Sequence, residues 1–141
     1  MILPSQSLRE LGIERPWTWG WRDAVRFSEI DRLGHVNNAA YAVWLETLRV
    51  HWFIESGLSS YGPDDPFLVV RRQSIDYLAE MRFPQEYVVI QHVAATGRTS
   101  FTLACEVRSG GTVHARGEVV VVQVRDGAKA PLSRETLARL T

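Results

Sequence analysis

A run of seven residues with no polar face is the feature that most constrains this chain of 141 residues. Residues 39–45 read AAYAVWL and directly follow a polar turn. A helix over this run is apolar on every side for almost two turns, so we expect it to be buried all round. In a chain this short, such burial requires a sheet curled around the helix. The sequence therefore predicts one long helix enclosed by a wrapped sheet.

The turn before this helix concentrates polar and turn-forming residues. Five of them lie within eight positions: Asp31, Gly34, His35, Asn37 and Asn38. This composition is typical of a tight turn that ends in a helix cap, and either asparagine is a suitable cap. The helix is expected to run to about Ser56, with Gly57 as its stop. Free backbone N–H groups at the start of a buried helix would stabilise an anionic or developing oxyanion group.

Five stretches with strand patterns accompany the helix. They are residues 17–28, 67–77, 87–95, 101–108 and 112–124. The first alternates around Trp17, Trp19 and Trp21, a stripe that we interpret as core or subunit packing rather than as a ligand wall. The polar residues 71–74 predict a bulge or a solvent-facing middle in the second strand. Short connections favour antiparallel pairing, and the exposed edges of such a sheet favour pairing with a second copy.

The elements together predict an α+β fold, a five-stranded and mostly antiparallel sheet wrapped around one long buried helix. Residues 1–16 are expected to form a loosely attached N-terminal arm, and residues 17–141 a single domain. The formal net charge is zero, so there is no basic footprint for nucleic acid, and no apolar run is long enough for a membrane helix. A single cysteine and no secretory signal favour the cytoplasm.

The motif Asp31-x-x-Gly-His-Val-Asn-Asn-x-x-Tyr41, with Glu46 and Arg49 downstream, resembles a known family. It is similar to the hotdog-fold acyl-CoA thioesterases of the 4-hydroxybenzoyl-CoA thioesterase-like superfamily, most of all to bacterial long-chain acyl-CoA members with a His-Val-Asn-Asn run. The resemblance implies a hotdog fold in which two chains pair their sheets side by side. It also implies an active site at the dimer interface near the start of the helix, and a homodimer or a homotetramer built from dimers.

The resemblance assigns roles to individual residues of the turn. Asp31 matches the carboxylate that either attacks the thioester carbonyl or activates water. Gly34 and His35 fall at the turn whose backbone N–H groups hold the thioester oxygen. His35, Asn37 and Asn38 match the polar trio that orients the carboxylate, the water or the substrate. The benzoyl-CoA enzyme itself lacks this trio, so its aromatic specificity is not carried over.

Further residues are candidates outside the turn. Tyr41 is expected to lie in the core with its hydroxyl bonded to a polar neighbour, or to help position the substrate. Glu46 is expected to pair with Arg49, with a supporting role in the site as the alternative. Arg98 resembles a hairpin position that contacts coenzyme A phosphates in some family members. Cys105 is interpreted as a packing residue. Three scattered histidines are given no function: His51, His92 and His114.

Thioester hydrolysis needs a nucleophile or base, a clamp on the carbonyl oxygen and a sheltered acyl slot. The expected function is therefore hydrolysis of an acyl-CoA or acyl carrier protein thioester. We expect no cofactor, because coenzyme A is part of the substrate, and no metal. An acyl-CoA hydratase or dehydratase on the same fold and a non-catalytic acyl-CoA-binding module are the alternatives. The sequence has no Gly-x-Ser-x-Gly elbow, phosphate-binding loop with lysine or His-Glu-x-x-His motif, which argues against other hydrolases.

Overall fold

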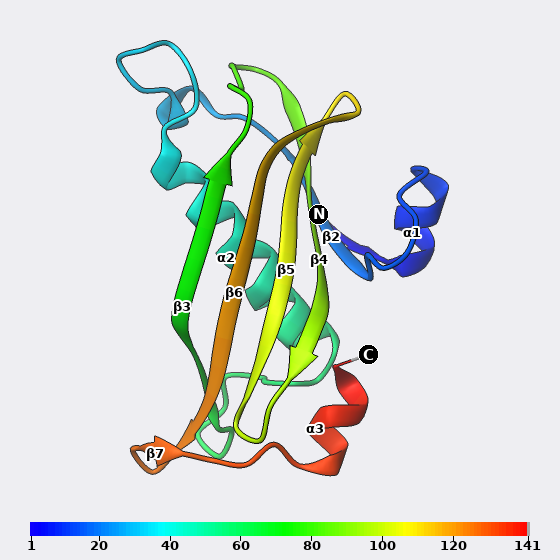
Figure 1. The fold of residues 1–141 in the computed structure, drawn as a ribbon, viewed down its shortest axis with the longest axis vertical. Coiled ribbons are helices and arrows are strands. Elements are labelled where there is room, and N and C mark those ends of the chain that lie inside the picture. Colours follow the sequence, from blue (N-terminus) through cyan, green and yellow to red (C-terminus); the bar gives the residue numbers. More distant parts are fainter. Residues whose placement is uncertain (141) are drawn as a thin grey trace.

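An antiparallel sheet of seven strands forms the body of the computed structural model, which describes residues 1–140 (Figure 1). The strands are β1 (Ile2–Pro4), β2 (Trp19–Ala24), β3 (Phe67–Tyr77), β4 (Glu86–Thr96), β5 (Ser100–Ser109), β6 (Thr112–Arg125) and β7 (Ala128–Lys129). Their order across the sheet is β1-β2-β4-β5-β6-β3, with β7 paired to β6. The helices are α1 (Ser5–Glu10), α2 (Asn38–Glu55) and α3 (Arg134–Arg139), with a 3-10 turn η1 (Phe27–Glu29) before α2.

The predicted α+β architecture is present, but the prediction of five strands is wrong. All five predicted strands exist, and the first is shorter than expected because η1 follows β2. The two additional strands, β1 and β7, have only three and two residues. Strands this short show no alternation of apolar and polar residues, so periodicity does not reveal them.

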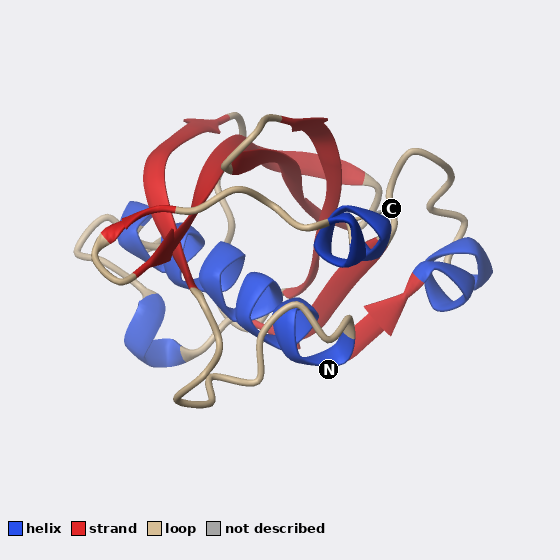
Figure 2. Cartoon of the chain, turned by 90° about the horizontal axis from the view of Figure 1, so that it is seen from below, coloured by secondary structure: helices blue, strands red, loops and turns tan. Residues whose placement is uncertain are grey.

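The helix α2 packs one face against the sheet and leaves the other open. Trp44 stacks on Tyr87 of β4 with ring centroids 3.9 Å apart, and Leu48 is completely buried. Val43 and Ile54, on the opposite face, are 56% and 52% exposed. The expectation of a helix buried on every side is therefore wrong for the single chain, because the sheet curves around only one side of α2 (Figure 2).

The N-terminal arm is anchored rather than loosely attached. Its first residues form β1, which pairs with β2, and α1 then packs on the face of the sheet turned away from α2. Leu8 of α1 is completely buried in a small core that includes Ile90. A Cβ atom at Gly20 would lie 2.8 Å from Cδ2 of Leu8, so only glycine allows this close approach.

Two local predictions about α2 and β3 are confirmed. Asn37 caps α2, and its side chain accepts a hydrogen bond from the Ala39 amide at 2.9 Å. The register of β3 against β6 shifts between Val70 and Arg72, which is the predicted bulge. Because β3 pairs only with β6, its other edge is free. None of the helices in residues 1–140 has the length and apolar character needed to cross a membrane.

Candidate active site

The polar turn before α2 is a closed loop held by backbone hydrogen bonds. The Asp31 amide donates to the His35 carbonyl at 3.0 Å, and the Asn37 amide donates to the Glu29 carbonyl at 2.8 Å. Gly34 has a φ of +86°, a conformation that other residues rarely adopt, and its amide donates to the Asp31 carbonyl at 3.1 Å. These bonds fix the side chains of Asp31 and His35 at the start of the helix.

The carboxylate of Asp31 has one oxygen in the turn and one beside His35. Its Oδ1 atom accepts a hydrogen bond from the Leu33 amide at 2.8 Å. Its Oδ2 atom lies 4.0 Å from Nδ1 of His35, and the two side chains are 25% and 27% exposed. The turn therefore presents an anchored, partly buried carboxylate next to an imidazole.

A pocket of about 470 Å³ opens beside these two side chains. It is lined by Asp31, Leu33, His35, Val36, Asn38, Tyr41, Tyr77, Leu78, Ala79 and Glu80. The rings of Tyr41 and Tyr77 pack edge to face with centroids 5.3 Å apart, and the Tyr77 hydroxyl donates to the Asn38 carbonyl at 3.2 Å. The pocket thus combines a polar group at the turn with aromatic and aliphatic walls.

The wall opposite the turn comes from the segment after β3, which sequence reasoning did not include in the site. Leu78, Ala79 and Glu80 form this wall. The Val36 amide donates to the Met81 carbonyl at 2.8 Å, so the segment is bonded directly to the polar turn. No local signal in the sequence indicates this pairing, because the two segments are more than 40 positions apart.

His114 of β6 binds the backbone of this wall segment. The backbone carbonyl of His114 accepts from the amides of Leu78 and Ala79 at 2.8 and 3.2 Å. Its Nδ1 atom lies 3.2 Å from the Ala79 carbonyl oxygen. A carbonyl oxygen only accepts, so Nδ1 carries the hydrogen, and Nε2 faces the Gln85 amide nitrogen at 3.5 Å. His114 is buried, and it therefore has a structural task that the sequence did not indicate.

Backbone N–H groups at the turn differ in their availability. The Gly34 amide is occupied by the Asp31 carbonyl. The amides of His35 and Asn38 have no acceptor within residues 1–140. Asn37 does not line the pocket, since its side chain caps α2. His35 and Asn38 both line the pocket, so each combines a place beside the pocket with an unoccupied backbone amide, whereas the Gly34 amide is occupied.

Of the other three predicted site residues, Tyr41 lines the pocket, and Glu46 and Arg98 do not. Tyr41 lines it, but its hydroxyl has no hydrogen-bond partner in the described residues, contrary to expectation, and burial raises its pKa. Glu46 is exposed, does not line the pocket and lies 4.0 Å from the buried Arg49. Arg98 is in the turn between β4 and β5 at the opposite end of the sheet (Figure 1). That is about 30 Å along the strand, so Arg98 does not reach this pocket within one chain.

Cys105 and the acidic residues offer no second reactive centre. Cys105 is buried, and this burial raises the pKa of its thiol to about 12, although the charge of Arg49 acts in the opposite direction. A thiol with so high a pKa is a poor nucleophile, which agrees with the predicted packing role. Within residues 1–140, no group of three or more histidine, cysteine, aspartate or glutamate side chains is arranged to hold a metal ion.

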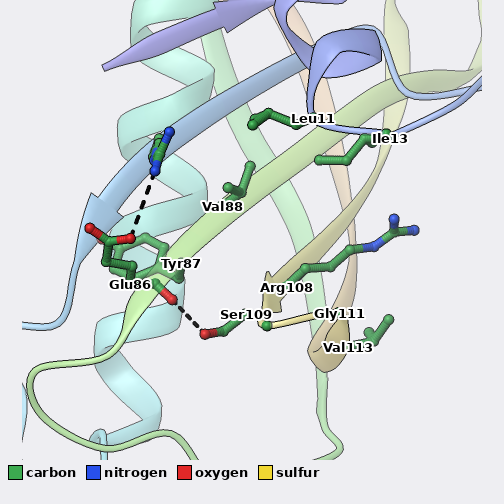
Figure 3. A pocket seen from close by; sticks show the side chains of 12 residues that line it. Leu11, Ile13, Glu86, Tyr87, Val88, Arg108, Ser109, Gly111 and Val113 are labelled. Atoms are coloured by element: carbon green, nitrogen blue, oxygen red, sulfur yellow. Dashed lines mark hydrogen bonds and ion pairs between the residues drawn. The ribbon is translucent and has the colours of Figure 1, made fainter.

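A second cleft, of about 380 Å³, lies on the outer face of the sheet beside the arm. Figure 3 shows Leu11 and Ile13 above Val88, with Glu86 and Arg108 at opposite ends of the cleft. The charged side chains that line it are already paired. Arg108 contacts Glu106 at 2.8 Å, and Glu86 lies 3.7 Å from Arg22 of β2. No histidine, cysteine or aspartate lines this cleft, so the pocket at Asp31 is the better candidate for an active site.

Both the fold and the comparison with known proteins identify the class of this protein. The sheet wrapped on one helix, with a carboxylate turn at the helix start, is the arrangement of a hotdog-fold thioesterase domain. Residues 25–140 match the model of the Thioesterase-like superfamily, so the chain belongs to this superfamily. The uncharacterized protein YsmA of Bacillus subtilis is 32% identical over 109 residues, which are 76% of this chain and 74% of YsmA.

Solved structures resemble the chain along most of its length. A thioesterase superfamily protein from Jannaschia sp. CCS1 has 37% identity and a TM-score of 0.88, covering 99% of this chain and 91% of that one. A thioesterase from Thermus thermophilus, complexed with coenzyme A and zinc, has 31% identity and a TM-score of 0.79. That match covers 89% of this chain and 97% of the Thermus chain. The fold and the superfamily predicted from the motif are thus confirmed.

Proposed function

We propose that this protein hydrolyses acyl-CoA thioesters in the pocket at Asp31. The observation that carries the proposal is the anchored Asp31 carboxylate, 4.0 Å from His35, at the opening of a pocket with apolar walls. A carboxylate and a nearby imidazole supply the base or nucleophile, and the pocket supplies a sheltered slot for the acyl group.

In the proposed reaction, Asp31 either attacks the thioester carbonyl carbon or takes a proton from an attacking water. The carbonyl oxygen then gains negative charge, and the unpaired amides of His35 and Asn38 are the donors proposed to hold it. Collapse of this intermediate breaks the carbon–sulfur bond, and the thiolate leaves and is protonated. If Asp31 is the nucleophile, water hydrolyses the resulting anhydride in a second step. His35 and Asn38 also orient the carboxylate and the water.

Coenzyme A is the proposed carrier of the acyl group. The Thermus relative, 31% identical over most of both chains, is a thioesterase with bound coenzyme A, which supports this choice over an acyl carrier protein. Arg98 is retained as a proposed contact for the nucleotide phosphates, and Glu46 as a proposed supporting residue. Because Arg98 is far from the pocket of its own chain, its contact would need the pocket of a second subunit.

A homodimer is the proposed assembly, with a homotetramer of such dimers as the larger form. The free edge of β3 and the open face of α2 support it, because both expose apolar side chains. Phe67 and Val69 of β3 are 70% and 43% exposed, and Val43 of α2 is 56% exposed. An unpaired strand edge flanked by such residues is suited to pairing with a second sheet. The cytoplasm is the proposed location, supported by the free, buried Cys105.

The test is an assay of purified protein against acyl-CoAs of increasing chain length, with a thiol reagent that detects released coenzyme A. Asp31→Asn and Asp31→Ala are compared with wild type, and Asp126→Asn in an exposed turn is the matched control. Loss of a general base should lower the rate about 100- to 10,000-fold in the Asp31 variants alone. Equal and slow release by all four proteins contradicts the proposal. Hydration of an enoyl-CoA, or tight binding without turnover, would instead favour the hydratase or the binding module.

A further inference from the structure

Tyr41 lies between the active-site pocket and a second space deeper under α2. Its side chain lines the pocket at Asp31 and also lines a narrow gap between α2 and the sheet. No other described residue lines both spaces. The gap is too narrow to hold a water molecule. The ring of Tyr41 is therefore the partition between an open pocket and a closed continuation of it.

The space behind Tyr41 is lined mostly by small or apolar residues and is kept open by a glycine. Besides Tyr41, its small or apolar lining residues are Leu45, Ile75, Cys105, Val107, Ala115 and Gly117, and its two charged ones, Glu106 and Arg116, pair with each other at 3.4 Å. A Cβ atom at Gly117 would lie 3.4 Å from Cδ1 of Leu45 and 2.9 Å from the Ser74 carbonyl oxygen. Any side chain at Gly117 would thus fill the gap and press on β3. A lining in which most residues are small or apolar suits the methylene groups of an acyl chain.

The Tyr41 ring is held by packing and not by its hydroxyl. Its ring centroid lies 5.0 Å from that of Trp44 and 5.3 Å from that of Tyr77. The hydroxyl has no hydrogen-bond partner within residues 1–140. The buried polar atoms without a partner in residues 1–140 are Arg49 Nη1 and Gln91 Nε2, so the Tyr41 hydroxyl is accessible to solvent and needs no partner in the chain. Packing against the two neighbouring rings therefore fixes the position of the Tyr41 ring.

We propose that Tyr41 is the specificity-determining residue that ends the acyl slot. The inference rests on the proposed hydrolysis of acyl-CoA at Asp31. An acyl chain that enters the pocket beside Asp31 and runs along α2 meets the Tyr41 ring. Chains that end at the ring are accepted, and longer chains are excluded. A smaller residue at this position joins the pocket to the gap and extends the slot toward Cys105.

The first measurement is the dependence of kcat/KM on acyl chain length. Each methylene that enters an apolar slot improves kcat/KM about fourfold. In wild type this rise should stop at a defined length. In Tyr41→Ala and Tyr41→Leu the rise should continue for two more methylenes, a gain of about 15-fold on the longer substrates. Tyr61→Ala is the matched control, because Tyr61 is 58% exposed and lines neither space.

The second measurement uses Cys105 as a reporter and does not depend on catalysis. Cys105 is the only cysteine of the chain and lines the gap. Alkylation by a small neutral thiol reagent, followed by mass spectrometry, should be slow in wild type and in Tyr61→Ala. It should be at least 10-fold faster in the two Tyr41 variants. A saturated fatty acid long enough to fill the extended slot, such as dodecanoate, should slow it again.

The outcomes separate this inference from the proposed function. One outcome is that no acyl-CoA is hydrolysed, but Cys105 is alkylated faster in the Tyr41 variants and dodecanoate slows this alkylation. This result supports Tyr41 as the end of the slot and contradicts the proposed hydrolysis. If hydrolysis is seen but the variants keep the wild-type length profile and the wild-type alkylation rate, Tyr41 does not end the slot. Tyr41→Leu keeps the apolar packing against Trp44, so it supplies a folded variant where Tyr41→Ala is too unstable, and circular dichroism verifies its fold.

Discussion

His114 contacts both the backbone amide and the backbone carbonyl of Ala79. The His114 carbonyl accepts from the Ala79 amide at 3.2 Å, and Nδ1 of the same histidine lies 3.2 Å from the Ala79 carbonyl oxygen. Two residues farther along, the Met81 carbonyl accepts from the Val36 amide at 2.8 Å. The segment after β3 thus connects the middle of the sheet to the polar turn. His114 is a positioning residue for the pocket wall, since it does not touch the pocket itself.

Replacing His114 by leucine should weaken both the fold and substrate binding. The variant leaves the partly buried Ala79 carbonyl without its side-chain donor, and loss of one such hydrogen bond costs about 0.5–1.5 kcal/mol. We expect a lower free energy of unfolding in urea, and a KM for acyl-CoA that rises more than kcat falls. His51→Leu is the control, because His51 is exposed and only stacks on Trp21. Identical kinetics in wild type and His114→Leu would show that the wall needs no support from His114.

The cap of α2 gives a prediction about a single acceptor atom. The Asn37 side chain accepts from the Ala39 amide at 2.9 Å. Asn37→Ala removes this acceptor and should lower the free energy of unfolding by about 0.5–2 kcal/mol. Asn37→Asp and Asn37→Ser keep an acceptor and should stay close to wild type in the same urea titration. An equal loss of stability in all three variants would assign the effect to something other than the cap.

The features that the sequence predicted correctly have local causes. The cap at Asn37, the end of α2 near Gly57 and the bulge of β3 depend on residues within a few positions of each other. The same holds for the motif that contains Asp31 and His35, which the structure brings together at 4.0 Å. Turn chemistry and helix capping act over one or two turns of chain, so a single sequence contains enough information to read them.

The features that were missed depend on contacts between distant segments. His114 and Ala79 are 35 positions apart, and no local pattern marks either one. The anchoring of the arm depends on Leu8 meeting Gly20 and Ile90, which requires the completed sheet. The exposed Val43 is a case in which a local pattern led to a wrong prediction. Its apolar neighbours predicted burial, but only the curvature of the sheet determines which face of α2 is covered.

Burial of Cys105 predicts a pH dependence of stability. Burial raises the pKa of the thiol from the ordinary 9.0 to about 12. Below pH 9 the thiol is protonated in both the folded and the unfolded state, so it has no effect. Above pH 9 only the unfolded state releases the proton, and the folded state should lose about 1.4 kcal/mol for each further pH unit. Urea titrations at pH 7, 9 and 10 measure this loss, which should be smaller in Cys105→Ala. Equal slopes in both proteins would contradict the prediction.

The free edge of β3 gives a prediction about assembly. Val69 lies in the middle of the apolar part of this edge and is 43% exposed. In the proposed dimer it is buried against a second sheet, so Val69→Glu places an unpaired charge in the interface, which is strongly unfavourable. We expect sedimentation to show dimers or tetramers for wild type and monomers for the variant at micromolar concentration. Leu11→Glu is the control, because Leu11 is 46% exposed on the arm, away from β3.

Activity of the Val69→Glu variant tests whether the site needs a second chain. The Asp31 pocket is complete enough in one chain to hold the carboxylate, the imidazole and the aromatic walls. Arg98, however, is at the other end of its own sheet, and in a side-by-side pair only the partner could bring such a residue near the pocket. A monomeric variant should therefore hydrolyse a short acyl thioester that lacks the nucleotide at nearly the wild-type rate. Its KM for the matching acyl-CoA should rise about 10-fold, the loss of one charge-assisted hydrogen bond. An unchanged KM in a proven monomer would remove Arg98 from the coenzyme A site.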